Sequence, residues 1–184
     1  MSRRAVAARA TARRALVALI ALGAATTAAC GGGGAAAAGP AATVTSRAPI
    51  AMTLPALDGG ELDLASWRGR VVVIHVFTTW SMAATADVPQ LVAADQRDDV
   101  SVVGLALDRE GRTTVAPWRR ALGVRYLVTL ADDAMIAGHS PLGPLEVVPA
   151  TIVLDRRGVI ARRVDRPLAD DELPRLIAEA AGTR

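Results

Sequence analysis

Two largely apolar runs, both containing several β-branched residues, constrain the fold of this 184-residue chain more than any other feature. They are VVVIHVF at residues 71–77 and VSVVGLAL at residues 100–107. Strands that are apolar on both faces are typical of a sheet that is covered on both sides. The connecting residues 83–97 favour a helix interrupted by Pro89, because a proline inside a helix removes a backbone hydrogen bond. These segments predict a βαβ unit with parallel strands and a right-handed crossover.

The flanking segments complete an α/β domain. The turn signal Asp58-Gly59-Gly60 and the alternation through Leu62 and Leu64 predict a short N-terminal β-hairpin. Further elements are expected at 113–122 (helix), 126–130 (strand), 132–137 (short helix), 150–155 and 159–164 (a second hairpin), and 170–181 (closing helix). We therefore predict a mixed central sheet with helices on both faces and an N-terminal hairpin extension.

Residues 1–29 are typical of a secretory signal peptide. Five arginines lie within the first 14 residues, and the apolar run ALVALIALGAA follows at residues 15–25. Positive charge, a short apolar run and small residues before a cleavage site are the parts of such a signal. The run is shorter than the roughly 20 residues that a transmembrane helix needs.

The single cysteine, Cys30, directly follows this segment. Ala28-Ala29-Cys30 resembles the lipobox of bacterial lipoproteins, although Thr27 stands where an apolar residue is usual. Residues 30–47 are interpreted as a lipid-anchor cysteine with a flexible Gly/Ala-rich tether, and residues 48–184 as the folded domain. We expect an extracytoplasmic domain, anchored to a bacterial membrane through lipid on Cys30. Two alternatives are an ordinary cleaved signal, which also places the domain outside the cytoplasm, and a retained membrane helix.

Charge and composition argue against several classes of function. Five of the 21 basic residues lie in the first 14 residues, which leaves 16 against 18 acidic residues in the remainder. Mixed charge of this kind does not favour nucleic-acid binding. One cysteine and two histidines, His75 and His139, are a poor set of metal ligands. We expect no metal and no cofactor.

The segment TTWSMAATADVPQL carries a family resemblance. It is similar to the pattern W-C-x-P-C-R-x-E-x-P-x-L of thioredoxin-like proteins of the TlpA/ResA type, which are related to the AhpC/TSA redoxins. Trp80 matches the tryptophan, whereas Ser81 and Ala84 occupy the two cysteine positions. Asp87 stands in for the glutamate, and Pro89 matches outright. Farther along, EVVPATIVLDRRGVI resembles the family's cis-proline loop and hairpin, with Pro149 at the cis-proline position.

The resemblance implies a thioredoxin-like fold and a membrane-tethered thiol-disulfide oxidoreductase. That reaction needs one thiolate to attack a disulfide and a second thiol to resolve the mixed disulfide. Ser81 and Ala84 can do neither, so we expect no catalytic residue at these positions. A serine at a helix N-terminus favours a cap over a hydrolytic nucleophile, because no G-x-S-x-G motif is present. His75 is expected in the core, and Asp87 on a solvated helix face.

The function that we favour is a redox-inactive binding module. In the thioredoxin fold the residue before the cis-proline, here Val148, offers backbone hydrogen bonds to an extended peptide. We expect Trp80, Ser81, Met82, Val148 and Pro149 to form a groove for an extended segment of an envelope protein. Two alternatives stay open. One is an oxidoreductase or antioxidant protein that acts only with a partner's cysteines, and the other is a structural lipoprotein domain without a groove function.

Overall fold

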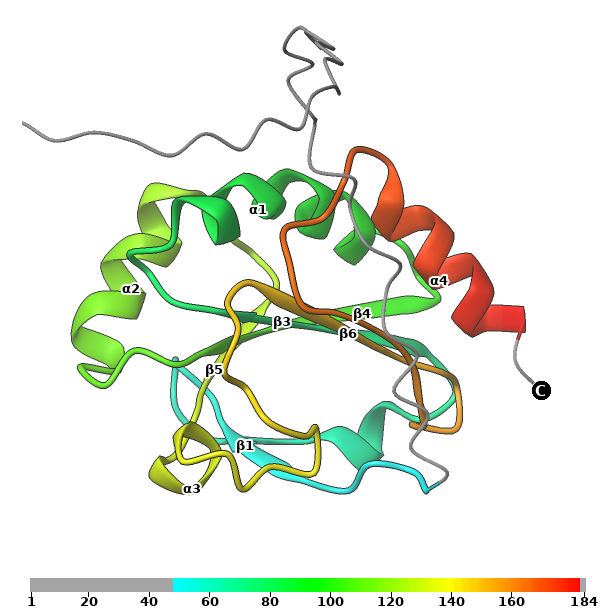
Figure 1. Ribbon diagram of the computed structural model, residues 1–184, viewed down its shortest axis with the longest axis horizontal. Coiled ribbons are helices and arrows are strands. Elements are labelled where there is room, and N and C mark those ends of the chain that lie inside the picture. The colour runs from blue at the N-terminus through cyan, green and yellow to red at the C-terminus, as the bar shows by residue number, and fades with distance from the viewer. Residues whose placement is uncertain (1–47, 183–184) are drawn as a thin grey trace, which may run out of the picture. The chain divides into compact units, whose positions relative to one another are not determined.

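The computed structural model describes residues 48–182, which form an α/β domain (Figure 1). Its first half contains β1 (Thr53–Pro55), β2 (Glu61–Asp63), the 3-10 helix η1 (Leu64–Trp67), β3 (Val71–Phe77), α1 (Met82–Asp95) and β4 (Val100–Ala106). Its second half contains α2 (Arg112–Ala121), β5 (Leu127–Leu130), α3 (Asp133–Ile136), β6 (Ala150–Leu154), β7 (Ile160–Val164) and α4 (Glu172–Gly182). The order of elements agrees with the order predicted from the sequence.

The central sheet is mixed and has the strand order β5-β4-β3-β6-β7. β3, β4 and β5 are parallel, as the βαβ pattern predicts, whereas β6 runs antiparallel to β3 and β7 antiparallel to β6. β1 and β2 form a separate antiparallel hairpin, in which Leu54 pairs with Leu62. The two predicted apolar runs therefore become the neighbouring strands β3 and β4 in the middle of the sheet.

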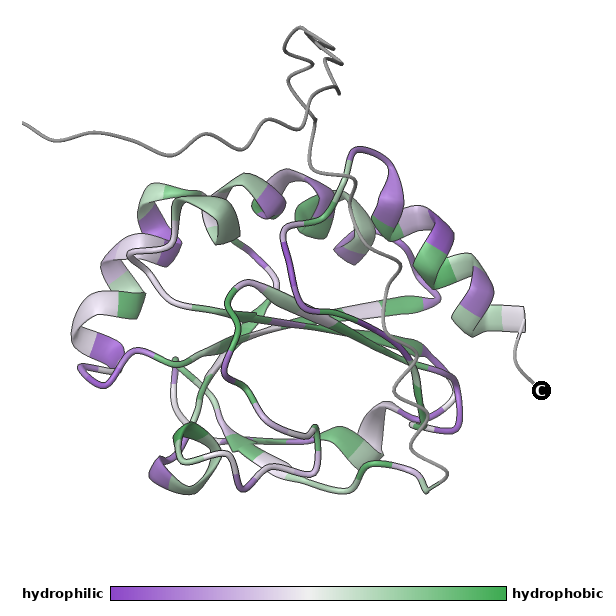
Figure 2. Cartoon of the chain, in the orientation of Figure 1, coloured by the Kyte–Doolittle hydropathy of each residue, from purple (hydrophilic) through white to green (hydrophobic). Residues whose placement is uncertain are grey.

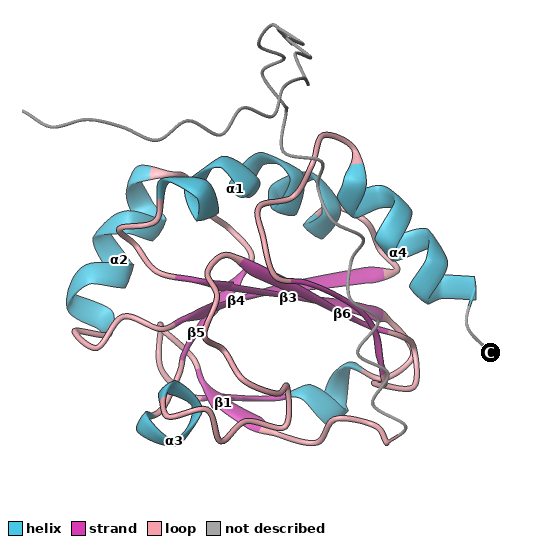
Figure 3. Ribbon diagram, viewed as in Figure 1, coloured by secondary structure: helices cyan, strands magenta, loops and turns pink. Residues whose placement is uncertain are grey.

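Helices α1, α2 and α4 cover one face of the sheet, and the hairpin with η1 and α3 covers the other (Figures 1 and 3). Alternate residues of β3 divide between the two layers. Val71, Val73 and Phe77 pack toward the helices, whereas Val72 and Ile74 pack toward the hairpin. This division explains why the strand is apolar on both faces. The hydropathy colouring shows hydrophobic residues concentrated along the strands of the sheet (Figure 2).

Two local details differ from the sequence prediction. Leu64 lies in η1 and not in a strand, because the Asp63 carboxylate accepts a hydrogen bond from the Ala65 N–H at 2.9 Å and begins the 3-10 turn. Helix α1 continues through Pro89 without a break.

Within residues 48–182, no helix is long and apolar enough to cross a membrane.

Candidate functional site

The predicted groove residues come from two segments that meet at one end of β3. Val76, near the end of β3, is paired with Ala150, the first residue of β6. The loop at residues 78–81 leaves β3 at this point, and the segment ending at Pro149 enters β6 beside it. Residues about 70 positions apart in sequence are therefore brought to the same edge of the sheet, because neighbouring antiparallel strands are hydrogen bonded there.

Ser81 is the N-cap of α1. Its Oγ accepts a hydrogen bond from the backbone N–H of Ala84 at 3.2 Å, and its backbone carbonyl accepts one from the N–H of Thr85 at 3.1 Å. Ser81 is only 8% exposed and Ala84 is fully buried. The helix N-terminus at which the family's oxidoreductases carry their attacking thiol is thus closed by a hydroxyl cap.

Two residues beside this cap project into solvent. Trp80 is 74% exposed and Met82 is 83% exposed. Val147, in the neighbouring segment, is 46% exposed, and these three are the exposed large hydrophobic side chains of the described chain. Exposed apolar residues that gather at one edge of a domain are characteristic of an interaction surface. The sequence prediction included Trp80 and Met82 but did not include Val147.

The Val148–Pro149 peptide bond is cis, as predicted. Pro149 is buried, whereas Val148 is partly exposed. Within the described chain, neither the N–H nor the C=O of Val148 has a hydrogen-bond partner. A backbone donor and acceptor that are free at the edge of a domain can pair with an extended chain.

His75 lies in the core below the start of α1. Its Nδ1 is 3.3 Å from Thr151 Oγ1, and its Nε2 has no hydrogen-bond partner among the described residues. Burial lowers the pKa of His75 to about 4. The backbone of Ala84 acts in the opposite direction but is too weak to cancel the effect of burial. The imidazole is therefore neutral at ordinary pH.

Neither histidine supports a hydrolytic role for Ser81. His75 contacts Thr151, and the backbone N–H of His139 bonds to the Ala134 carbonyl at 2.8 Å at the end of α3. No hydrogen bond between Ser81 and either imidazole is present in the described part of the chain. Residues 48–182 also contain no group of three His, Cys, Asp or Glu residues that could hold a metal ion.

The prediction that Asp87 lies on a solvated helix face is wrong. Asp87 is 2% exposed, and its Oδ1 accepts a hydrogen bond from the backbone N–H of Leu168 at 3.1 Å. Oδ2 has no partner within the described residues. Burial raises the pKa of this carboxyl to about 6; the Leu168 hydrogen bond opposes the shift, and the nearby Glu172 carboxylate adds to it. The segment before α4 covers this side of α1, which the sequence pattern of α1 alone does not reveal.

Asp108 is a positioning residue that sequence reasoning missed. It follows β4, and its two carboxylate oxygens accept hydrogen bonds from the backbone N–H of Thr79 at 3.1 and 3.0 Å. The Thr79 hydroxyl also donates to Asp108. Because β3 and β4 are parallel, residues after their carboxyl ends lie close together. This contact ties down the residue that precedes Trp80.

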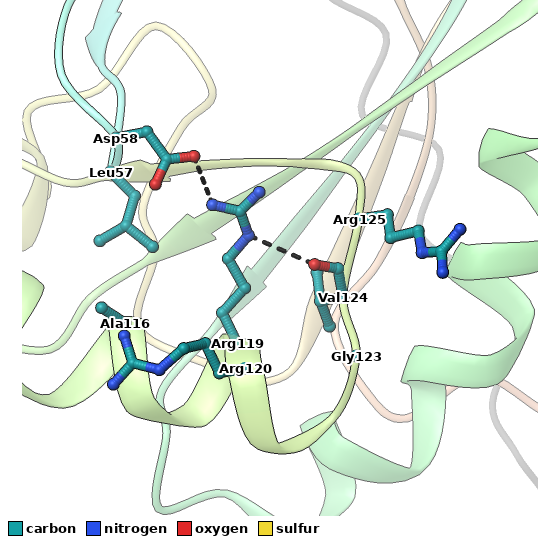
Figure 4. A pocket seen from close by; sticks show the side chains of 8 residues that line it. All are labelled: Leu57, Asp58, Ala116, Arg119, Arg120, Gly123, Val124 and Arg125. Atoms are coloured by element: carbon teal, nitrogen blue, oxygen red, sulfur yellow. Dashed lines mark hydrogen bonds and ion pairs between the residues drawn. The ribbon is translucent and has the colours of Figure 1, made fainter.

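Away from the predicted groove, a hollow lies at the end of α2 and is formed by the hairpin loop and the segment after the helix (Figure 4). Arg119 forms an ion pair with Asp58, and its Nε donates to the Val124 carbonyl at 3.3 Å. Arg120 and Arg125 extend away from this pair (Figure 4). The Arg119 contacts join the hairpin to α2, so the role of Arg119 in this hollow is structural.

Cys30, the predicted lipidation site, lies outside the described residues, as do residues 1–47 as a whole. The signal peptide and the tether predicted for that part of the chain therefore stay predictions.

Comparison with known proteins supports the same fold. A sequence model of the AhpC/TSA family matches residues 44–163. No curated protein matches the chain. Among solved structures, a DsbF homologue from Corynebacterium diphtheriae is 21% identical, with a TM-score of 0.64, and the match covers 71% of this chain and 85% of that one.

Two further solved structures are similar. A thiol:disulfide interchange protein of the thioredoxin family from Chlorobium tepidum has a TM-score of 0.63 at 21% identity, covering 73% of this chain and 95% of that one. A secreted disulfide oxidoreductase from Mycobacterium tuberculosis, homologous to E. coli DsbE, has a TM-score of 0.57 at 21% identity, covering 72% and 96%. At this level of identity the likeness establishes the fold.

Proposed function

The chain belongs to the AhpC/TSA family and has its thioredoxin-like fold, and on this basis we propose that it binds an extended segment of another envelope protein without thiol chemistry. The observation that carries the proposal is the free backbone of Val148 beside the exposed Trp80 and Met82, next to a capped helix that has no thiol. The surface for binding is retained where the groups for redox catalysis are missing.

The absence of thiols from the fold supports the first part of the proposal. The chain has one cysteine, Cys30, which precedes the family match at residues 44–163. The Ser81 hydroxyl cannot form a disulfide, and the Ala84 methyl group cannot resolve one. Both residues are instead used in the cap of α1. Reduction or oxidation of a substrate by this domain would require cysteines supplied by the partner.

The edge beside Val148 supports the second part. Strand addition uses main-chain hydrogen bonds for affinity and side-chain contacts for selectivity. Val148 supplies a free N–H and C=O, while Trp80, Met82 and Val147 supply apolar area that is exposed in the unbound domain. Pro149 is buried and Asp108 holds Thr79, so both segments of the groove are anchored to the sheet.

The location is also part of the proposal. Residues 1–29 and Cys30 have the pattern of an exported, lipid-anchored protein. Structurally similar proteins from Corynebacterium glutamicum and Mycobacterium tuberculosis are described as secreted. We infer that the domain faces the outside of the cytoplasmic membrane and meets its partner in the cell envelope. Lipidation of Cys30 would be detected as a mass increase on that residue in membrane extracts.

The test is calorimetric binding of short Val/Thr-rich peptides to the full-length chain in detergent. We expect Trp80→Ala and Met82→Ala to weaken binding, by about tenfold for the tryptophan, since aromatic anchors dominate small interfaces. N-methylation of alternate peptide nitrogens is expected to abolish binding in one register only, because it removes the donors that pair with Val148. Arg175→Ala, an exposed residue of α4, is the control. Equal binding by Trp80→Ala and the native chain would contradict the proposal.

A further inference from the structure

A hollow adjoins the Val148 edge and lies outside the groove of the proposed function. We call it the Glu146 hollow. It is lined by Gly143, Pro144, Glu146, Val147, Arg163 and Asp165. Its exposed wall is mostly apolar, and Val147 joins it directly to the segment that precedes the cis peptide bond. A side chain of a peptide bound at Val148 therefore has a place to enter beside the groove.

Arg163 forms a fixed floor for this hollow. It is 5% exposed, and its Nε donates to the Asp165 carboxylate at 2.7 Å. Nη1 donates to the Leu142 carbonyl at 2.8 Å, and Nη2 donates to the Pro144 carbonyl. These contacts hold the segment at 142–144 against β7. The charge of Arg163 is matched by Asp165, so this pair adds no net charge to the hollow.

Glu146 differs from the other charged residues of the hollow. Its side chain is exposed and makes no hydrogen bond or ion pair among the described residues. The hollow thus carries one uncompensated negative charge above a mostly apolar wall. Lysine and arginine side chains have the complementary form, because an apolar stem can lie along such a wall while the charged end reaches a carboxylate.

We propose that the Glu146 hollow is a specificity pocket that receives one lysine or arginine side chain of the bound extended peptide. This inference rests on the proposed function and narrows its partner to segments that combine apolar residues with a basic one. The basic residue occupies a single position of the peptide, because the backbone contact at Val148 fixes the register. The exposed carboxylate gives selectivity and a modest part of the affinity.

The test uses the full-length chain in detergent and a set of Val/Thr-rich peptides in which one Arg, Gln or Glu is moved along the sequence. At one position we expect the Arg peptide to bind about 2- to 5-fold more tightly than the Gln peptide, the gain of an exposed ion pair. The Glu peptide is expected to bind more weakly than both. The preference for Arg is expected to decrease as salt is added.

Variants of the protein separate the charge from the shape of the hollow. Glu146→Gln is expected to remove the preference, so that the Arg and Gln peptides bind with equal affinity. Glu146→Arg is expected to reverse the preference in favour of the Glu peptide. Glu61→Gln, an exposed position on β2, is the matched control and is expected to keep the native preference.

The outcomes distinguish the two proposals. Equal binding of the Arg and Gln peptides at every position, or a preference for Arg that survives in Glu146→Gln, overturns the basic pocket. The proposed function still stands in that case if binding remains sensitive to Trp80→Ala. A preference for the Glu peptide by the native chain also overturns the pocket. Absence of binding by every peptide overturns the proposed function and this inference with it.

Discussion

The Oγ atom of Ser81 accepts the backbone N–H of Ala84 at 3.2 Å, so a helix cap joins the two positions that carry cysteines in the family's oxidoreductases. The serine occupies the end of α1 where the positive end of the helix dipole would stabilise a thiolate. A neutral hydroxyl uses the same location for a hydrogen bond. The cap explains how this end of α1 is satisfied without a thiol.

The cap leads to a stability prediction. Ser81→Ala is expected to lower the free energy of unfolding by about 1 kcal/mol, because the N–H of Ala84 loses its acceptor at a buried site. Urea denaturation checks this value. Ser66→Ala is the control. The Ser66 hydroxyl donates to the Asp63 carbonyl at an exposed position, so its loss should change the free energy of unfolding by less than about 0.5 kcal/mol. If Ser81→Ala left the free energy of unfolding unchanged, the Ser81 hydrogen bond would not stabilise the helix as a cap.

Asp87 should make the domain less stable as the pH rises. Its pKa is raised from 3.8 to about 6 in the fold, so between these values the folded state binds more protons than the unfolded state. The stability of the native chain relative to Asp87→Asn is expected to fall by up to about 3 kcal/mol from pH 4 to pH 7, and to stay constant above that. Urea denaturation across this range is the measurement. If the difference in stability between the native chain and Asp87→Asn did not vary with pH, the raised pKa of the buried Asp87 carboxyl would be contradicted.

His75 should act in the opposite direction. Its pKa is lowered from 6.5 to about 4, so the unfolded state binds more protons between these values and stability is lost as the pH falls through them. Compared with His75→Asn, the native chain is expected to lose up to about 3 kcal/mol on going from pH 7 to pH 4. NMR titration of the imidazole gives an independent value. Because the His75 and Asp87 slopes oppose each other, the native pH curve alone would hide both.

Gly104 should not tolerate a side chain. A Cβ at this position of β4 would lie 3.0 Å from Cε1 of Phe77 and 3.3 Å from Cε2 of Tyr126, both buried in the helix-side layer. Gly104→Ala is expected to cost about 1–3 kcal/mol because two packed rings must shift. Gly182→Ala is the control, since a methyl group at that position would have no atom within 4 Å and alanine favours a helix. Equal stabilities for the two variants would contradict the close packing.

The sequence predicted the parts of this molecule that depend on local pattern. The apolar runs that became β3 and β4, the turn at Gly59-Gly60 and the cis peptide bond before Pro149 all follow from residue types or from the family resemblance. Each is encoded within a short stretch of chain, and in the structure each lies where the prediction placed it.

Features that depend on distant contacts could not be predicted in this way. Asp87 is buried because Leu168, 81 residues farther along the chain, lies over it. Asp108 fixes Thr79 across two parallel strands, and Arg163 holds the loop at 142–144 from the neighbouring strand β7. The environment of each side chain is set by a segment that has no periodic relation to it. The Glu146 hollow depends on such a contact and became apparent only in three dimensions.

The most direct test of the account is insulin disulfide reduction in the presence of dithiothreitol. The native chain, a Cys30→Ser chain, and a Ser81→Cys/Ala84→Cys double variant in the Cys30→Ser background would be compared. We predict no rate above background for the first two and clear activity for the double variant, because the helix end and the neighbouring loop remain in place. Reduction of insulin by the Cys30→Ser chain would contradict the claim that this domain has no thiol chemistry of its own.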